Sequence, residues 1–108
     1  MNKMVKTEMT KSKVKKLLSD VSDEKRFWSC DGQLLKNIPE LETSLKEMNH
    51  DTFHYHVNES RNDFSNWVRD VIGDEKLAQD LQKSKTQAQA TRCVSERISE
   101  LKLHIKTK

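Results

Sequence analysis

The chain has 108 residues and a formal net charge of +3, with 33% hydrophobic and 34% charged residues. This length predicts one domain with a thin core, and no stretch is apolar enough to predict a membrane span. Only two glycines and one proline are present, which excludes a β-sandwich or barrel with many turns and favours helices.

Two further features predict where the protein acts. Cys30 and Cys93 are far apart in the sequence and match no disulfide framework. The lysines near the N-terminus are not followed by the apolar segment of a secretory signal. We therefore expect a cytoplasmic protein without a membrane role.

Most of the positive charge lies near the N-terminus. Residues 1–16 contain six lysines and one glutamate, a net charge of +5, so the remaining residues sum to −2. An i, i+3, i+4, i+7 pattern predicts a short helix here, with an apolar face made by Val14, Leu17, Leu18 and Val21. The lysines that crowd this helix are Lys11, Lys13, Lys15 and Lys16. If they contact nucleic acid, they bind its phosphates without base readout; a solubilising, partly disordered segment is the interpretation that we favour.

A change of pattern between residues 26 and 36 predicts a β-hairpin. The dipeptide Asp31-Gly32 lies between two apolar runs and is typical of a type I′ turn, in which both central residues have positive φ. A lone two-stranded ribbon is marginal in water. We therefore expect it to lean on helices through its large apolar side chains, Phe27, Trp28, Leu34 and Leu35.

The first helix after the hairpin begins with a clear signal. Asn37 is a good N-cap and Pro39 falls in the first turn, where proline is tolerated. Its apolar face is made by Ile38, Leu41, Leu45 and Met48. Asp51 or Thr52 then predicts a short helical turn through Val57; a strand over residues 52–57 is the alternative, and we favour the helix.

The next two helices follow from similar signals. Asn62 caps the first of them and Asp63 favours its positive end. Its apolar face is made by Phe64, Trp67, Val68 and Val71. Gly73 predicts a left-handed helix end, and Asp74 predicts the cap of a second helix. The apolar face of this second helix begins with Leu77, Ala78 and Leu81.

A long amphipathic helix is predicted at the C-terminal end. Its apolar stripe repeats at spacings of 4, 3 and 4 and consists of Val94, Ile98, Leu101 and Ile105. This coiled-coil-like stripe covers less than two heptads. It can fold back on the hairpin, or it can pair with a second copy of the chain as an oligomer face.

Four segments resemble a small helical domain of unknown function found in archaea and some bacteria. They are "FWSCDGQLLKNIPEL", "FHYHVN", "NDFSNWVRDVIGDEKLAQDL" and "SERISELK", which together span residues 26–103. The resemblance implies no activity, ligand or catalytic residue. It does imply that residues 1–25 are a basic, partly helical arm outside a domain of residues 26–108.

The histidines near residue 55 are the first candidate site. On a strand, His54 and His56 would face the same way and could share a metal ion, whereas on a helix they diverge and His50 pairs with His54. There is no CxxC or HExxH motif, so an interfacial histidine that bonds the backbone or Asp63 is the stronger interpretation. The candidate functional cluster is His54, His56, Asp63 and Trp67.

Acidic residues near the two middle helices are a second candidate. Asp70 and Asp74 are four residues apart and could act as acid and base, but no nucleophile or oxyanion donor is near. The joint "VIGDEKLAQDL" resembles the turn of a helix-turn-helix. The first exposed residues of its second helix would be Asp74 and Glu75, which repel phosphate, so we interpret the joint as packing.

These patterns predict a mainly helical single domain, a small bundle with a β-hairpin at about residues 26–36. We predict a non-enzymatic interaction module that binds a protein or a second copy of itself, with no catalytic residues, metal ligands or cofactor. A nucleic-acid-associated protein that uses the lysine-rich segment is the alternative. A metal-dependent site at His54 and His56 is a third hypothesis.

Overall fold

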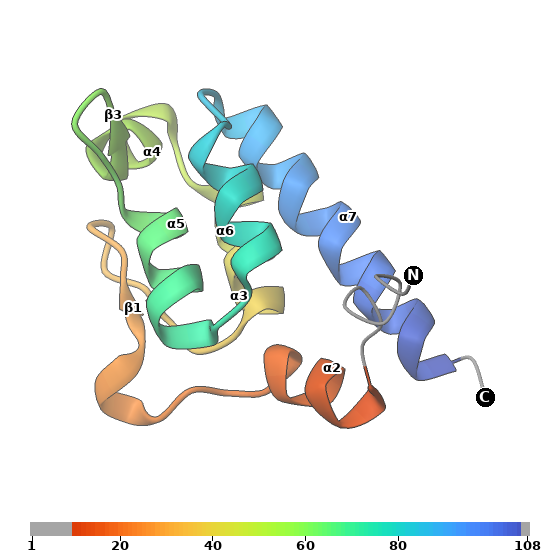
Figure 1. Ribbon diagram of the computed structural model, residues 1–108. Coiled ribbons are helices and arrows are strands. Elements are labelled where there is room, and N and C mark those ends of the chain that lie inside the picture. The colour runs from red at the N-terminus through yellow and green to blue at the C-terminus, as the bar shows by residue number, and fades with distance from the viewer. Residues whose placement is uncertain (1–9, 107–108) are drawn as a thin grey trace.

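The computed structural model describes residues 10–106 as a bundle of helices with two short hairpins (Figure 1). The helices are α2 (Lys11–Leu18), α3 (Ile38–Glu47), α4 (His50–His56), α5 (Asp63–Trp67), α6 (Glu75–Gln82) and α7 (Gln87–Lys106). The hairpin strands are β1 (Phe27–Trp28), β2 (Leu34–Leu35), β3 (Val57–Asn58) and β4 (Arg61–Asn62). A 3-10 turn, η1 (Asp23–Lys25), precedes β1, and a π-helical turn, η2 (Val68–Ile72), extends α5. The predicted fold class is confirmed; the second hairpin was not predicted.

The first hairpin lies where it was predicted, but its turn and its contacts differ. Phe27 pairs with Leu35 and both are buried, whereas Trp28 pairs with Leu34 and these side chains are 55% and 54% exposed. The prediction that all four lean on helices is therefore wrong for the outer pair. Gly32 has φ of 99°, but no described non-glycine residue has positive φ, so the turn is not type I′.

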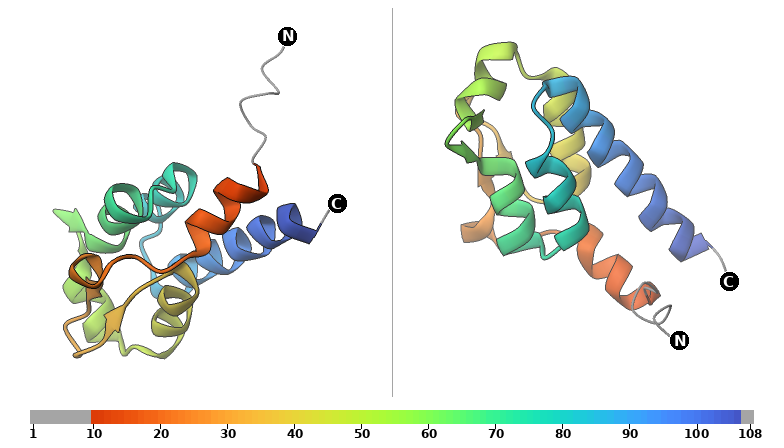
Figure 2. Two further views of the ribbon diagram at one scale, coloured as in Figure 1. Left: turned by 90° about the horizontal axis from the view of Figure 1, so that it is seen from below. Right: turned by 45° about the horizontal axis from the view of Figure 1, so that its top comes forward.

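Helix α2 is part of the core. Val14 and Leu17 are buried in the same hydrophobic cluster as the apolar faces of α3 and α7, and α2 lies along the last turns of α7 (Figures 1 and 2). Val14 and Leu17 of the predicted arm therefore contribute to the same core as the helices that follow it. Residues 1–9 of the predicted arm lie outside the described part of the chain.

Helix caps match the predictions at three of four helices. The side chain of Asn37 accepts from the Glu40 N–H, that of Asn62 accepts from Ser65 N–H, and that of Asp74 accepts from Leu77 N–H. The cap of α4 is Asn49 rather than Asp51 or Thr52. Residues 52–56 are helical, as we favoured, and Val57 begins β3.

Helix α7 packs mainly on α3, α2 and α6 rather than on the hairpin. Its predicted stripe is used inside the chain: Val94, Ile98 and Leu101 are buried, and Ile105 packs against the same core. A capping box starts the helix, because the Gln89 N–H donates to Thr86 Oγ1 while Gln89 Oε1 accepts from the Thr86 N–H. The stripe is therefore not presented to a second copy of the chain.

A buried ion pair ties α6 to the middle of α7. Arg97 Nε lies 2.8 Å from Asp74 Oδ2, and Arg97 Nη2 lies 3.0 Å from Asp74 Oδ1. Burial opposes the charge on the guanidinium, but hydrogen bonds and attraction from Asp74 and Glu100 outweigh it and raise the pKa of Arg97. The preceding Gly73, with φ of 89°, takes the predicted left-handed conformation and brings Asp74 to this position.

Replacing Arg97 by alanine is expected to lower the free energy of unfolding by about 3–5 kcal/mol, because Asp74 would stay buried without a counter-charge. Urea denaturation followed by far-UV circular dichroism measures this loss. Arg69→Ala is the matched control, since Arg69 forms a solvent-exposed pair with Asp70 and its loss is expected to have no measurable effect. A loss for Arg97→Ala no larger than for the control would contradict the prediction.

Candidate interaction surface at the hairpin

His56, the last residue of α4, joins the first hairpin to α5. Its ring is 2% exposed. Its Nδ1 lies 2.9 Å from Asp63 Oδ2, and its Nε2 lies 3.0 Å from the backbone nitrogen of Cys30. A backbone N–H only donates, so Nε2 accepts, and the ring proton sits on Nδ1 and is donated to Asp63. The neutral His56 side chain thus links the hairpin turn to α5 through hydrogen bonds at both ring nitrogens, and we call this the His56 bridge.

Aromatic rings fill the space around this bridge. The ring centroid of Phe27 lies 5.1 Å from that of His56, 5.0 Å from that of Phe64 and 5.7 Å from that of Trp67. Trp67 Nε1 donates to the Lys25 carbonyl over 2.8 Å. The predicted cluster of His56, Asp63 and Trp67 is therefore a packing joint, and the interpretation of His56 as an interfacial histidine bonded to Asp63 is confirmed.

His54 does not belong to this joint. It lies on another face of α4, where its Nε2 is 3.1 Å from Nε2 of His50. His54 and His56 therefore share no ligand position, and a metal site built on both is wrong. Among residues 10–106, no group of three or more His, Cys, Asp or Glu side chains is placed to hold a metal ion.

The outer side of the joint carries an exposed group of side chains. Trp28 and Leu34 are cross-strand neighbours on the solvent face of the hairpin. The Trp28 ring meets the half-exposed ring of Tyr55 edge-on at 6.4 Å between centroids. The Arg61 guanidinium lies 5.1 Å from the Tyr55 ring centroid and donates to the Tyr55 carbonyl. We call Trp28, Leu34, Tyr55 and Arg61 the aromatic patch.

A hollow of about 510 Å³ adjoins this patch at Leu34. It lies between the hairpin and α3, with Leu34 and Leu35 on one side and Thr43 and Ser44 on the other. The Ser44 hydroxyl is buried and has no hydrogen-bond partner among the described residues. The patch therefore continues into a concave surface.

Comparison with known proteins gives a family but no function. A family model with the description "family of unknown function (DUF5752)" matches residues 20–101. The chain belongs to this family. No curated protein and no solved structure matches the chain. The match includes the whole aromatic patch and the His56 bridge, and it begins after α2. This agrees with the predicted resemblance to a small domain of unknown function.

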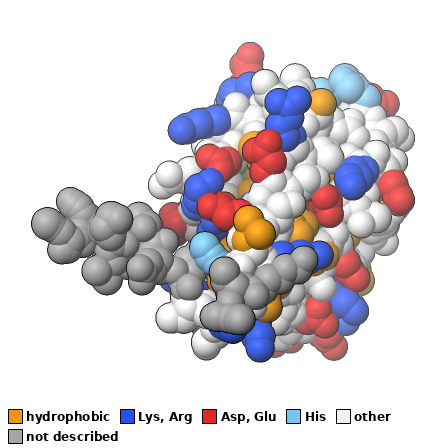
Figure 3. Space-filling view, turned by 90° about the vertical axis from the view of Figure 1, so that its right-hand side faces the viewer, with side chains coloured by type: hydrophobic (Ala, Val, Ile, Leu, Met, Phe, Trp, Pro, Cys, Tyr) orange, Lys and Arg blue, Asp and Glu red, His pale blue; other side chains and the backbone are white. Residues whose placement is uncertain are grey.

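The lysines predicted to contact nucleic acid lie on the solvent face of α2 in this DUF5752 chain. Lys11, Lys13, Lys15 and Lys16 are exposed, and no carboxylate among residues 10–106 pairs with them. They lie outside the region matched by the family model. The surface around α7 differs from the lysine-rich face of α2 in its charge. Figure 3 shows acidic and basic side chains interleaved over it.

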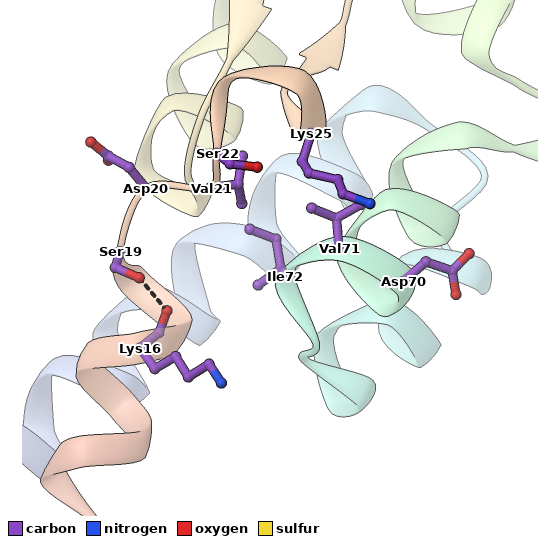
Figure 4. A pocket seen from close by; sticks show the side chains of 9 residues that line it. All are labelled: Lys16, Ser19, Asp20, Val21, Ser22, Lys25, Asp70, Val71 and Ile72. Carbon is purple, nitrogen blue, oxygen red and sulfur yellow. Dashed lines mark hydrogen bonds between the residues drawn. The ribbon is translucent and has the colours of Figure 1, made fainter.

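A second hollow, of about 260 Å³, lies between the end of α2 and η2 in the DUF5752 chain. In Figure 4, Val21, Val71 and Ile72 meet at its centre, and Lys16 and Lys25 extend beside them. Its carboxylates are engaged elsewhere: Asp20 accepts from Asn37 Nδ2, and Asp70 accepts from Arg69. The hydrogen bond from Arg69 also lowers the pKa of Asp70 below its usual range.

The predicted pairing of acidic residues does not occur. Asp70 is exposed and bound to Arg69, whereas Asp74 is buried and bound to Arg97. The expectation that Asp74 would be an exposed first residue of a recognition helix is therefore also wrong. Among the described residues, no helix has the length and apolarity needed to cross a membrane.

Sequence reasoning missed the aromatic patch although a signal for part of it was present. Successive strand residues point to opposite faces, so Phe27 and Trp28 could not both face the helices. Burial of Phe27 left Trp28 on the outside. No local signal places Arg61 over Tyr55, because the second hairpin brings it there.

The His56 bridge predicts a graded response to substitution. His56→Ala is expected to lower the free energy of unfolding by about 3 kcal/mol, because a cavity forms and the Cys30 N–H and Asp63 lose their partner. His56→Gln keeps an acceptor for the Cys30 N–H. Its loss in the free energy of unfolding is therefore expected to be about half that of His56→Ala. Thermal denaturation of wild type, His56→Ala and His56→Gln measures the order of their stabilities. An equal loss for both variants would contradict the bridge geometry.

Proposed function

We propose that this DUF5752 domain is a non-enzymatic interaction module that binds a protein partner through the aromatic patch. The observation that carries this proposal is a chain of exposed contacts: Trp28 lies beside Leu34 and meets Tyr55, and Arg61 lies over the Tyr55 ring. Tryptophan, tyrosine and arginine are the residues most enriched at binding hot spots. The adjoining hollow beside Leu34 gives a partner side chain a place to anchor.

The interior groups that resemble catalytic ones are already engaged, which supports a non-enzymatic role. Both nitrogens of His56 are bonded, to Asp63 and to the Cys30 amide. The Asp74 carboxylate is neutralised by Arg97. A general base needs a free lone pair directed at a substrate, and these groups have none to spare in the described arrangement.

The size of the patch favours a short segment of a partner over a second copy of the chain. Two half-exposed aromatic side chains present roughly 100 Å² each, so with Leu34 and Arg61 the patch is on the order of 400 Å². A stable dimer buries about 800 Å² per partner. The apolar stripe of α7 that could have enlarged such an interface is buried instead.

The test compares Trp28→Ser and Tyr55→Ser with wild type, using each as bait in native lysate. A captured protein is identified, purified and titrated against all variants. We expect the affinity to fall about tenfold or more in both patch variants, because each removes a hot-spot side chain. Leu103→Ser is the matched control, since Leu103 is 65% exposed on α7, outside the patch.

Equal affinity of wild type and patch variants would contradict the proposal, as would an equal loss for Leu103→Ser. Light scattering over a range of concentrations separates the remaining alternative. A wild-type dimer that becomes a monomer in Trp28→Ser would replace the partner by a second copy of the chain.

The alternative function is sequence-independent binding of nucleic acid through α2. The favouring observation is that Val14 and Leu17 fix α2 to the core, which holds four exposed lysines on its outer face, none of them paired with a carboxylate among residues 10–106. If all four contact duplex DNA, affinity is expected to fall about a hundredfold between 50 and 200 mM salt.

A gel shift at these two salt concentrations tests the alternative. Lys13→Gln with Lys16→Gln is expected to weaken binding and to reduce the salt dependence. Lys83→Gln with Lys102→Gln changes the net charge equally and is the control, because both lysines are exposed and lie outside α2. Equal weakening by the two double variants would reject a role for α2.

A further inference from the structure

A groove of about 730 Å³ lies where α3 ends, α4 passes and α7 begins, near the upper end of the molecule in Figure 1. Lys46 of α3, Lys85 of the α6–α7 connection and Arg92 of α7 line it. His50 and His54 of α4 line its remaining side. Among the described residues that form this groove there is no carboxylate. We call it the cationic groove.

Arg92 is unusual among the arginines of the chain. Four of the five arginines in residues 10–106 pair with carboxylates; they are Arg26, Arg61, Arg69 and Arg97. Neither Arg92 nor the neighbouring Lys85 has an ion-pair partner in this part of the chain. A guanidinium presents paired N–H donors that match a carboxylate or phosphate. Lys46 pairs with Glu42, whose Oε2 lies 3.6 Å from its Nζ, so the uncompensated positive charge in this concave surface is that of Lys85 and Arg92.

The two histidines add donors that an anion can recruit. Their Nε2 atoms are 3.1 Å apart, so one imidazole donates to the other and the pair needs only one proton between these two atoms. Each neutral imidazole has one N–H, which either ring nitrogen can carry, so exchanging this hydrogen bond for bonds to an anion leaves two N–H donors side by side. An oxyanion seated between them would accept from both. The charged groups that face the pair are Lys46, Lys85 and Arg92, all basic.

Three amides at the start of α7 are not available for this purpose. The Gln89 N–H donates to Thr86 Oγ1, and the amides of Lys85 and Thr86 donate to Gln89 Oε1. The proposal therefore assigns recognition in the cationic groove to side chains. The volume of the groove falls within the range of small-molecule sites, about 300–1,000 Å³.

We propose that the cationic groove binds a small organic anion with at least two negative charges on phosphate or carboxylate groups. Arg92 and Lys85 hold one anionic group, and the ring N–H groups of His50 and His54 hold another. This site is independent of the aromatic patch, because α4 presents Tyr55 to Trp28 and its two outer histidines to the groove. Either proposal can fail without the other.

The test uses the full chain with inorganic pyrophosphate and citrate as separate probes. Calorimetric titration is expected to give a dissociation constant of about 1 mM or lower for at least one probe. Arg92→Gln and Lys85→Gln are each expected to weaken binding at least about fivefold. Lys102→Gln is the matched control, since it removes the same charge from an exposed position farther along α7.

Amide chemical shifts of the wild-type protein provide a measurement that needs no variant. The probe is expected to move the resonances of His50, His54 and residues 85–92, and to leave those of Trp28 and Tyr55 in place. Absence of binding by both probes would overturn the proposal. Equal weakening of binding by Lys102→Gln would also overturn it, as would chemical-shift changes confined to α2 or the hairpin. Binding of duplex DNA through Arg92, without binding of either small anion, would overturn it as well.

Discussion

The position of the first hairpin depends on one buried imidazole. Each of its strands has two residues, too few to hold a ribbon together in water. His56 fixes the turn through the Cys30 amide and fixes itself to α5 through Asp63. With the hairpin held in this way, Phe27 enters the ring cluster and Trp28 is left outside. The exposure of Trp28 in the aromatic patch thus follows from the burial of its strand neighbour Phe27, which the hydrogen bonds of His56 hold in place.

Local signals in the sequence predicted local structure well. A cap acts on an amide within three residues, so Asn37, Asn62 and Asp74 could be identified without knowledge of the fold. Gly73 was predictable for the same reason, because its positive φ is a property of one residue. The helical bundle followed from these caps and from the periodicity between them.

Non-local relations could not be predicted in this way. The stripe of α7 showed that one helix face is apolar, but it did not show which elements cover it. Arg97 is charged and lies beside that stripe, and only the approach of α6 shows that it meets Asp74 in the interior. The cationic groove was missed for a similar reason, since Lys85 and Arg92 are joined to His50 and His54 only by tertiary packing.

The two described ends of the chain lie together, away from the aromatic patch and the cationic groove. Helix α2 begins beside the last turns of α7, as Figures 1 and 2 show. The twenty residues of α7 separate this end from the cationic groove by about 30 Å. A partner bound at the aromatic patch or in the cationic groove would therefore leave this end of the bundle uncovered.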